Sequence, residues 1–170
     1  RLTNEEVMAR CPWATFGKLK HRGPNIVTSL ELDPAEMEKR NIHLQQKYAE
    51  IEEKEVRYEE IHCDDAEYLI VAFGSCARIA QKAMEEARAE GIKVGLLRPI
   101  TLWPFPSKAI AERSRQVKGI LTVELNAGQM VEDVRLAVEC KVPVEYFGRL
   151  GGIVPDPDEV VTALKEKIIK

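Results

Sequence analysis

Short apolar runs and amphipathic stretches alternate regularly in the second two-thirds of the chain. Runs that are apolar on both faces are typical of strands buried between two layers. They lie at Glu67–Phe73, Ile92–Pro99, Gly119–Leu125 and Val142–Gly148. Helical spacing follows each run, at about Cys76–Glu90, Ser107–Gln116 and Gly128–Glu139, and after Asp156. Four strand–helix repeats predict an α/β fold, a mostly parallel sheet with helices on both faces.

The segment before these repeats has a different pattern. Glu55–Ile61 is a short strand candidate, which we expect at an antiparallel edge of the sheet. Asp33-Pro34-Ala35-Glu36 is a helix-start signal, and the helix is predicted to end near Lys54. Glycine and proline punctuate residues 1–35. We therefore divide the chain into residues 1–54, an arm with a connecting helix, and residues 55–170, the α/β domain.

Composition narrows the class of protein. The net charge is −3, and lysine and arginine are interleaved with acidic residues, so no nucleic-acid-binding face is expected. No apolar run is long enough to span a membrane. The four cysteines form no Cys-x-x-Cys pair, which disfavours a cluster or zinc site held by this chain. We expect a reduced, cytoplasmic setting and interpret the chain as a portion of a longer protein.

Two loops at the carboxyl ends of strands are candidates for anion or cofactor binding. Gly74 and Ser75 precede a helix, where backbone N–H groups are free. The bland alternative is a turn capped by Ser75, followed by a structural Cys76. Gly151 and Gly152, with Arg149 as a charge partner, form the other candidate. Its alternative is a structural connection.

Two further loops are candidate partner contacts. Glu124, Asn126 and Gln129 follow a buried strand, beside two small residues. Asn126 there is interpreted either as a helix cap or as part of a polar contact surface. In "LLRPITLWPFP" (Leu96–Pro106), three prolines stiffen a loop that carries Trp103 and Phe105. These aromatic residues either anchor an interface or fold back over their own sheet.

The sequence contains no recognisable pattern of catalytic residues or metal ligands. The three histidines, His21, His43 and His62, precede the α/β repeats in separate contexts, at no metal-ligand spacing. No Ser-His-Asp order or carboxylate pair stands out. We therefore predict no catalytic residue and no metal ligand in this chain.

A set of five segments carries a family resemblance. They are Val71–Ser75, Gly91–Pro106, Val123–Val138, Val142–Pro155 and Pro157–Val160. In this order and spacing the chain, over residues 33–170, resembles the C-terminal domain of the α subunit of 2-oxoacid:ferredoxin oxidoreductases. The 3-methyl-2-oxobutanoate (2-oxoisovalerate) type is the nearest and the 2-oxoglutarate type comes next.

The resemblance implies a function that the residues do not reveal by themselves. This family oxidatively decarboxylates a 2-oxoacid, transfers the acyl group to coenzyme A and reduces ferredoxin. It uses thiamine diphosphate, magnesium and 4Fe–4S clusters, which we expect in the full complex and not in this chain. The implied fold is transketolase C-terminal-like, a three-layer α/β/α sandwich whose five-stranded sheet has one antiparallel strand.

We therefore expect an assembly domain that is inactive in isolation. Its expected partners are a thiamine diphosphate-binding β subunit and an iron–sulfur subunit, with ferredoxin as an indirect partner and self-association into a homo-oligomer left open. The alternatives are the α subunit of a 2-oxoglutarate enzyme, a free-standing nucleotide- or small-molecule-binding module, and an interaction protein unrelated to redox chemistry.

Overall fold

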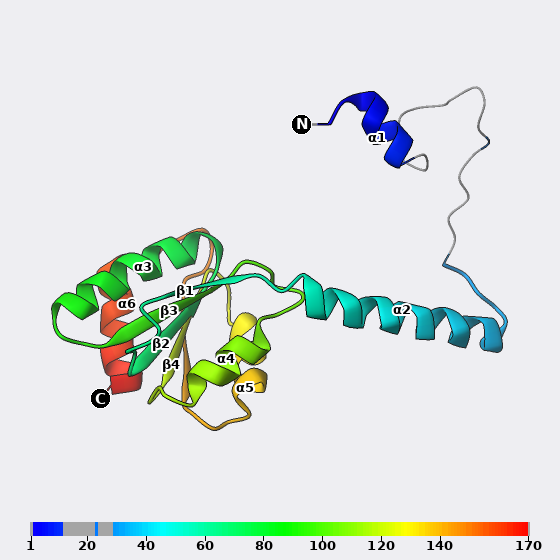
Figure 1. Ribbon diagram of the computed structural model, residues 1–170. Coiled ribbons are helices and arrows are strands. Elements are labelled where there is room, and N and C mark those ends of the chain that lie inside the picture. The colour runs from blue at the N-terminus through cyan, green and yellow to red at the C-terminus, as the bar shows by residue number, and fades with distance from the viewer. Residues whose placement is uncertain (1, 12–22, 24–28, 170) are drawn as a thin grey trace. The chain divides into compact units, whose positions relative to one another are not determined.

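The computed structural model describes residues 2–11, 23 and 29–169, drawn in colour in Figure 1. Predictions made for residues 12–22 and 24–28, including His21, lie outside the described residues. The chain forms two compact units, Arg1–Leu44 and Gln45–Lys170. The second unit takes in the last turns of the connecting helix as well as the α/β repeats.

The first unit contains helix α1 and the first part of helix α2. Helix α1 spans Asn4–Arg10, and Thr3 and Glu6 form a reciprocal capping box at its start. Helix α2 spans Pro34–Lys54 and crosses the boundary between the units. The Asp33 carboxylate accepts the backbone N–H groups of Ala35 at 2.8 Å and Glu36 at 3.1 Å, which confirms the predicted helix start.

The second unit is a five-stranded sheet in the order β1-β3-β2-β4-β5. Strand β1 is antiparallel to β3, and the other pairs are parallel, as predicted. In chain order the elements are β1 Tyr58–Ile61, β2 Tyr68–Ala72, α3 Gly74–Ala89, β3 Val94–Pro99, α4 Ser107–Ser114, β4 Ile120–Glu124, α5 Met130–Val138, β5 Val144–Gly148, α6 Pro157–Leu164 and η1 Lys165–Ile169.

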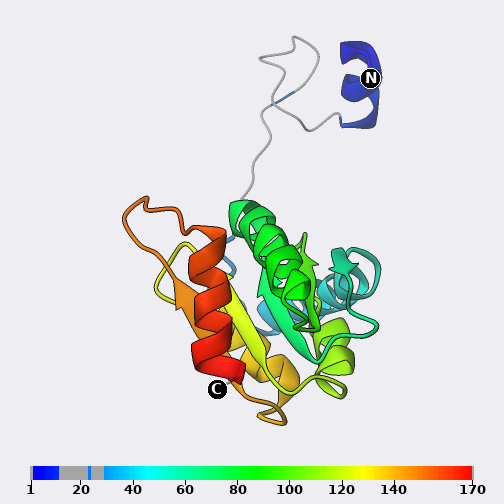
Figure 2. The same ribbon diagram turned by 90° about the vertical axis from the view of Figure 1, so that its left-hand side faces the viewer.

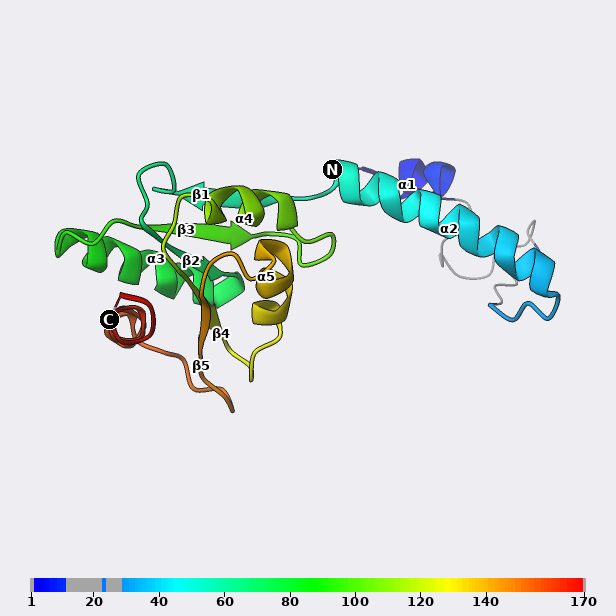
Figure 3. The ribbon, with the colours of Figure 1, turned by 90° about the horizontal axis from the view of Figure 1, so that it is seen from below.

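Helices cover both faces of this sheet. Helices α3 and α6 lie side by side on one face, and α4 and α5 cover the other (Figures 2 and 3). Alternate residues of β2 divide between the two cores: Ile70 packs toward α3 and α6, and Leu69 toward α4 and α5. A strand buried on both faces reads as a continuous apolar run, and this explains why the sequence predicts β2 and β4 well.

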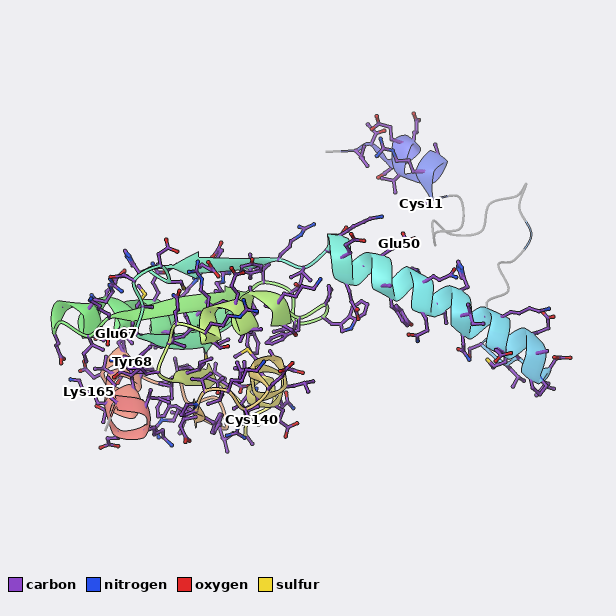
Figure 4. All side chains as sticks on the ribbon, turned by 60° about the horizontal axis from the view of Figure 1, so that its bottom comes forward. Cys11, Glu50, Glu67, Tyr68, Cys140 and Lys165 are labelled. Atoms are coloured by element: carbon purple, nitrogen blue, oxygen red, sulfur yellow. The ribbon has the colours of Figure 1, made fainter. Side chains whose placement is uncertain are left out.

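The two ends of the parallel strands differ in chemistry. We call the end where these strands begin the amino edge and the end where they finish the carboxyl edge. At the amino edge, where β2 begins, the Lys118 ammonium lies 2.5 Å from a Glu67 carboxylate oxygen and 5.9 Å from the centre of the Tyr68 ring. Figure 4 labels Glu67 and Tyr68 at this place. At the carboxyl edge, exposed large apolar side chains follow three of the strands: Ile100, Leu102, Trp103, Leu125, Leu150, Ile153 and Val154. The carboxyl edge is therefore where a contact with another molecule is to be sought.

Candidate functional site

The carboxyl edge contains a change of direction in the chain topology. Strand β2 leads through α3 to β3 on one side, whereas β4 leads through α5 to β5 on the other. The loops after β2 and β4 therefore leave the sheet toward opposite faces, which is the position where open α/β sheets bind ligands. The predicted residues Gly74 and Ser75 begin α3 directly after the first of these connections. Glu124 ends β4, and Asn126 and Gln129 lie in the loop that follows it.

Glu124 is a buried polar residue at this edge that accepts several hydrogen bonds. Its side chain is fully buried at the end of β4. Its carboxylate accepts the backbone N–H groups of Gln129 at 3.2 Å, Met130 at 2.8 Å and Val131 at 2.9 Å. These are N–H groups at the start of α5, where the helix dipole favours negative charge. Glu124 thus occupies, from within the chain, the place where an external anion would bind.

Asn126 does not cap α5. Its side-chain oxygen accepts the N–H of Gly128 at 2.7 Å and so closes a local turn. Gln129 stands at the N-cap position without a side-chain cap bond. The capping alternative for Asn126 is therefore wrong. The carboxylate of Glu124, at the end of β4, accepts the N–H groups at the start of α5 in its place. Sequence reasoning missed this role because it looked for caps among residues next to the helix.

Tyr146 of β5 closes the same loop from the other side. Its hydroxyl donates a hydrogen bond to the carbonyl of Asn126. The ring crosses Gly148, where a Cβ would lie 2.5 Å from the ring carbon Cζ and 2.9 Å from the Asn126 carbonyl oxygen. Burial, followed by the negative charge of Glu124, raises the pKa of Tyr146. Tyr146 therefore remains a protonated donor at neutral pH. No sequence pattern indicates this role for Tyr146.

The loop after β2 leaves the start of α3 without a side-chain cap. Helix α3 begins at Gly74 directly after Phe73, without a side-chain cap bond, so the predicted Ser75 cap is wrong. Ser75 lies in the first turn and is exposed. Cys76 is buried, and burial, together with the charge of Glu124, raises the pKa of its thiol. A buried thiol with a raised pKa is a structural residue rather than a nucleophile.

The glycine-rich loop after β5 is tied to α6. Arg149 forms an ion pair with Glu159, which also completes the capping box of α6 with Asp156. Gly151 and Gly152 have φ angles of 67° and 85°, a conformation that favours glycine, and they are exposed. The positive charge of Arg149 is thus already used within the chain. In the sheet order, β4 separates this loop from Gly74 and Ser75, so the structure does not bring these candidates together.

The proline loop places its two aromatic residues differently. Phe105 is half-buried and packs against the core beneath α4 and α5. Trp103 is 55% exposed, and its ring meets that of Tyr48 from α2 edge-to-face, with centroids 5.6 Å apart. Phe105 therefore folds back onto the sheet, as one alternative predicted, whereas Trp103 stays exposed, as the other requires. No sequence signal pairs Tyr48 with Trp103.

Few histidine or cysteine side chains of the described residues lie near the carboxyl edge, where they could take part in acid–base or metal chemistry. His62 follows β1 at the opposite edge from Glu124 and Cys76, and His43 is exposed on α2. Residues 2–11, 23 and 29–169 contain no group of three side chains that could hold a metal ion. All four cysteines are free thiols, with exposed Cys140 in the turn after α5 labelled in Figure 4. No helix within the described residues is both long and apolar enough to cross a bilayer.

Comparison with solved structures defines the fold. The domain is similar to a 2-oxoglutarate:ferredoxin oxidoreductase from Magnetococcus marinus, solved with 2-oxoglutarate, coenzyme A and succinyl-CoA. That match has a TM-score of 0.70 at 24% identity and covers 80% of this chain and 24% of the other. A split-gene transketolase, described as an inactive beta4 tetramer, matches with a TM-score of 0.57 at 22% identity over 65% of this chain and 40% of its own. The domain thus has the predicted transketolase-like α/β fold.

Comparison of sequences identifies the family. Residues 66–160 match the model of the pyruvate:ferredoxin oxidoreductase core domain II. A ketoisovalerate oxidoreductase subunit VorB from Methanothermobacter thermautotrophicus is 49% identical over 154 residues. A 2-oxoglutarate synthase subunit KorA from Methanothermobacter marburgensis is 33% identical over 101 residues. The chain belongs to the pyruvate:ferredoxin oxidoreductase core domain II family. The VorB match covers 91% of this chain and 43% of that relative, so the chain spans less than half of it.

Proposed function

We propose that this chain is a domain of the VorB-like subunit of a ketoisovalerate oxidoreductase. The observation that carries the proposal is the contrast between two kinds of relative. Identity to this VorB is 49% and extends over 91% of this chain, whereas identity to the KorA subunit from Methanothermobacter marburgensis is 33% over 59%, and another KorA that matches 82% of the chain is 30% identical. The full complex would oxidatively decarboxylate 2-oxoisovalerate, transfer the acyl group to coenzyme A and pass electrons to ferredoxin.

Within that complex the domain would hold subunits together rather than perform chemistry. Two features support this role. The polar groups at the carboxyl edge are engaged with one another, as Glu124 is with the start of α5 and Arg149 with Glu159. Large apolar side chains are exposed at the same edge. Residues that are tied to each other beside an exposed apolar surface fit an interface better than a reaction centre.

The cofactors of such a complex do not fit the donor groups in the described part of this chain. A 4Fe–4S cluster needs four thiolates in one place. Here Cys63 and Cys76 are buried in the two different cores, and Cys140 lies in a separate turn. A diphosphate needs free cationic or N–H groups, but Glu124 fills the start of α5. We therefore assign thiamine diphosphate, magnesium, the clusters and coenzyme A to other parts of the complex. We expect a cytoplasmic setting, in which free thiols stay reduced.

The substrate is tested with the complete complex, purified anaerobically. Reduction of ferredoxin or methyl viologen is followed with 2-oxoisovalerate, 2-oxoglutarate or pyruvate, each in the presence of coenzyme A. We expect kcat/KM for 2-oxoisovalerate to exceed that for pyruvate by roughly tenfold or more, the range that a difference of one or two methylenes in a pocket gives. We expect a preference over 2-oxoglutarate as well, because its second carboxylate would have to be buried without a partner in a pocket shaped for an apolar group. A preference for 2-oxoglutarate would replace the proposal with the 2-oxoglutarate type. Turnover of none of the three would refute both.

The isolated chain provides a separate check. We expect no turnover and no stoichiometric binding of thiamine diphosphate or coenzyme A when either is titrated into the isolated chain in a calorimeter. Saturable binding at the loops of Gly74 or Gly151 would favour a free-standing nucleotide-binding module instead.

A further inference from the structure

A groove of about 760 Å³ lies beside the proline loop, within the unit Gln45–Lys170. Its wall on α2 is formed by Ala49, Glu52 and Glu53. Its opposite wall is formed by residues 103–106, with Tyr58 of β1 and the first residues of α4 completing the lining. The groove thus lies between two segments that are distant in sequence, residues 49–58 and residues 103–109.

The groove is held in shape by hydrogen bonds that do not depend on a partner. The Thr101 hydroxyl accepts the backbone N–H of Arg57 at 3.0 Å and donates to the carbonyl of Pro104 at 2.8 Å. The N–H groups of Ile100 and Thr101 both donate to the carbonyl of Arg57, at 2.9 and 3.1 Å. Pro104 and Pro106 are buried. A preformed groove loses little conformational entropy when it is occupied.

Exposed aromatic rings give the groove its apolar character. Trp103 is 55% exposed and Tyr58 is 43% exposed. Edge-to-face packing against Tyr48 orients the Trp103 ring. Tryptophan and tyrosine in preformed, partly buried settings are the side chains most often found to dominate binding energy.

The charge of the groove points to the chemistry of its occupant. Glu52 and Glu53 are exposed and form no ion pair with another described residue, whereas Glu50 pairs with Lys54 and Glu55 pairs with Arg57. Lys108 at the start of α4 is also in the lining, which leaves the groove with one net negative charge. Two unpaired carboxylates opposite an exposed indole ring suit a cation, which both groups attract.

We infer that this groove docks a segment of a partner subunit that presents an arginine or lysine beside an apolar side chain. The cation would lie between the α2 carboxylates and the Trp103 ring, and the apolar neighbour would cover Phe105. The inference rests on the proposed function, because it needs a partner subunit.

The test uses the complete complex with paired charge reversals. Glu52→Lys with Glu53→Lys should weaken association of the subunit with its partner by roughly tenfold or more, since one partner of a charge pair then meets a like charge. Added salt should also weaken association of this variant less than it weakens association of the wild type, or should strengthen it, because salt screens the new repulsion. The matched control, Glu112→Lys with Glu166→Lys, changes charge equally at exposed glutamates outside the groove and should leave association unchanged. Circular dichroism establishes that each variant folds.

A photo-crosslinker at Leu102, the exposed residue before Trp103, identifies the occupant. We expect crosslinks to a segment of another subunit with a lysine or arginine within a few residues. Crosslinks within the same chain, to a segment without a basic residue, or to nothing would overturn the inference. So would equal association and equal salt dependence of the variant and control complexes. In each of these cases 2-oxoisovalerate turnover by the wild-type complex would still support the proposed function, whereas its absence would reject that function separately.

Discussion

The buried carboxylate of Glu124 accepts the backbone N–H of Met130 at 2.8 Å, which joins the end of β4 to the start of α5. The same carboxylate accepts the N–H groups of Gln129 and Val131. A charged acceptor with several N–H donors is the arrangement in which a buried carboxylate is tolerated. It fixes the loop of residues 125–129 on the exposed carboxyl edge of the sheet.

Replacement of Glu124 by glutamine should destabilise the chain. Glutamine keeps one acceptor oxygen but directs an NH₂ donor at N–H groups, so at least one of them loses its partner. We expect the free energy of unfolding to fall by about 1–3 kcal/mol, measured by urea denaturation. Glu132→Gln, an exposed first-turn residue of the same helix, should cost less than about 0.5 kcal/mol. Equal effects of the two changes would contradict the capping role.

Gly148→Ala should also be destabilising, through Tyr146. The added methyl would lie 2.9 Å from the Asn126 carbonyl oxygen and 2.5 Å from the Tyr146 Cζ, so the ring must move and lose its hydrogen bond. Overpacking of this kind costs about 1–3 kcal/mol. In a Tyr146→Ala background the same change should cost clearly less, because the obstructing ring is absent. A double-mutant cycle measures this coupling, and additive effects would show that the ring is not responsible.

The sequence predicted the fold better than the site, and particular residues show why. Leu69 and Ile70 are buried on opposite faces of β2, so burial itself produces the continuous apolar pattern from which the strand is predicted. Asp33 caps α2 by contacts within three residues, which a local motif reveals. Glu124 caps α5 from five to seven residues away, across a strand–loop connection. Local capping rules therefore offered Asn126 as the candidate cap and gave no such role to Glu124.

Stability at alkaline pH should depend on Cys63. Burial raises the pKa of its thiol to about 11 from the ordinary value of 9.0. The folded chain therefore keeps the proton that the unfolded chain releases first. The thiol's contribution to stability is complete below pH 9 and is lost as the pH rises toward 11. Unfolding free energies measured from pH 8 to 11 should fall more steeply for the wild type than for Cys63→Ala. Parallel curves would contradict this.

Thiol reactivity gives an independent test of the same burial. Cys140 is exposed, whereas Cys63 and Cys76 are buried with raised pKa values. Iodoacetamide at pH 8 should modify Cys140 within the native chain and reach the two buried thiols after unfolding. Peptide mass spectrometry of a time course identifies the order. Early modification of Cys76 would show that the start of α3 opens more readily than the structure indicates.

The two aromatic residues of the proline loop should separate stability from assembly. Phe105→Ala removes a half-buried ring from the core and should lower the free energy of unfolding by about 1–3 kcal/mol, below the cost for a fully buried phenylalanine. Trp103→Ala should change stability by less than about 1 kcal/mol and weaken association of the subunits. Urea denaturation and native mass spectrometry measure the two properties. The sequence left interface and fold-back open because proline stiffness is compatible with both.

The central claim is that this chain is a module of an oxidoreductase complex. Native mass spectrometry of the complete gene product, purified anaerobically from its own source, tests this claim most directly. We predict a complex that contains an iron–sulfur subunit and thiamine diphosphate, and that dissociates more readily when Glu52 and Glu53 are replaced by lysine. A cofactor-free species without other subunits would contradict the proposed function while leaving the fold and the Glu124–Met130 contact unchanged.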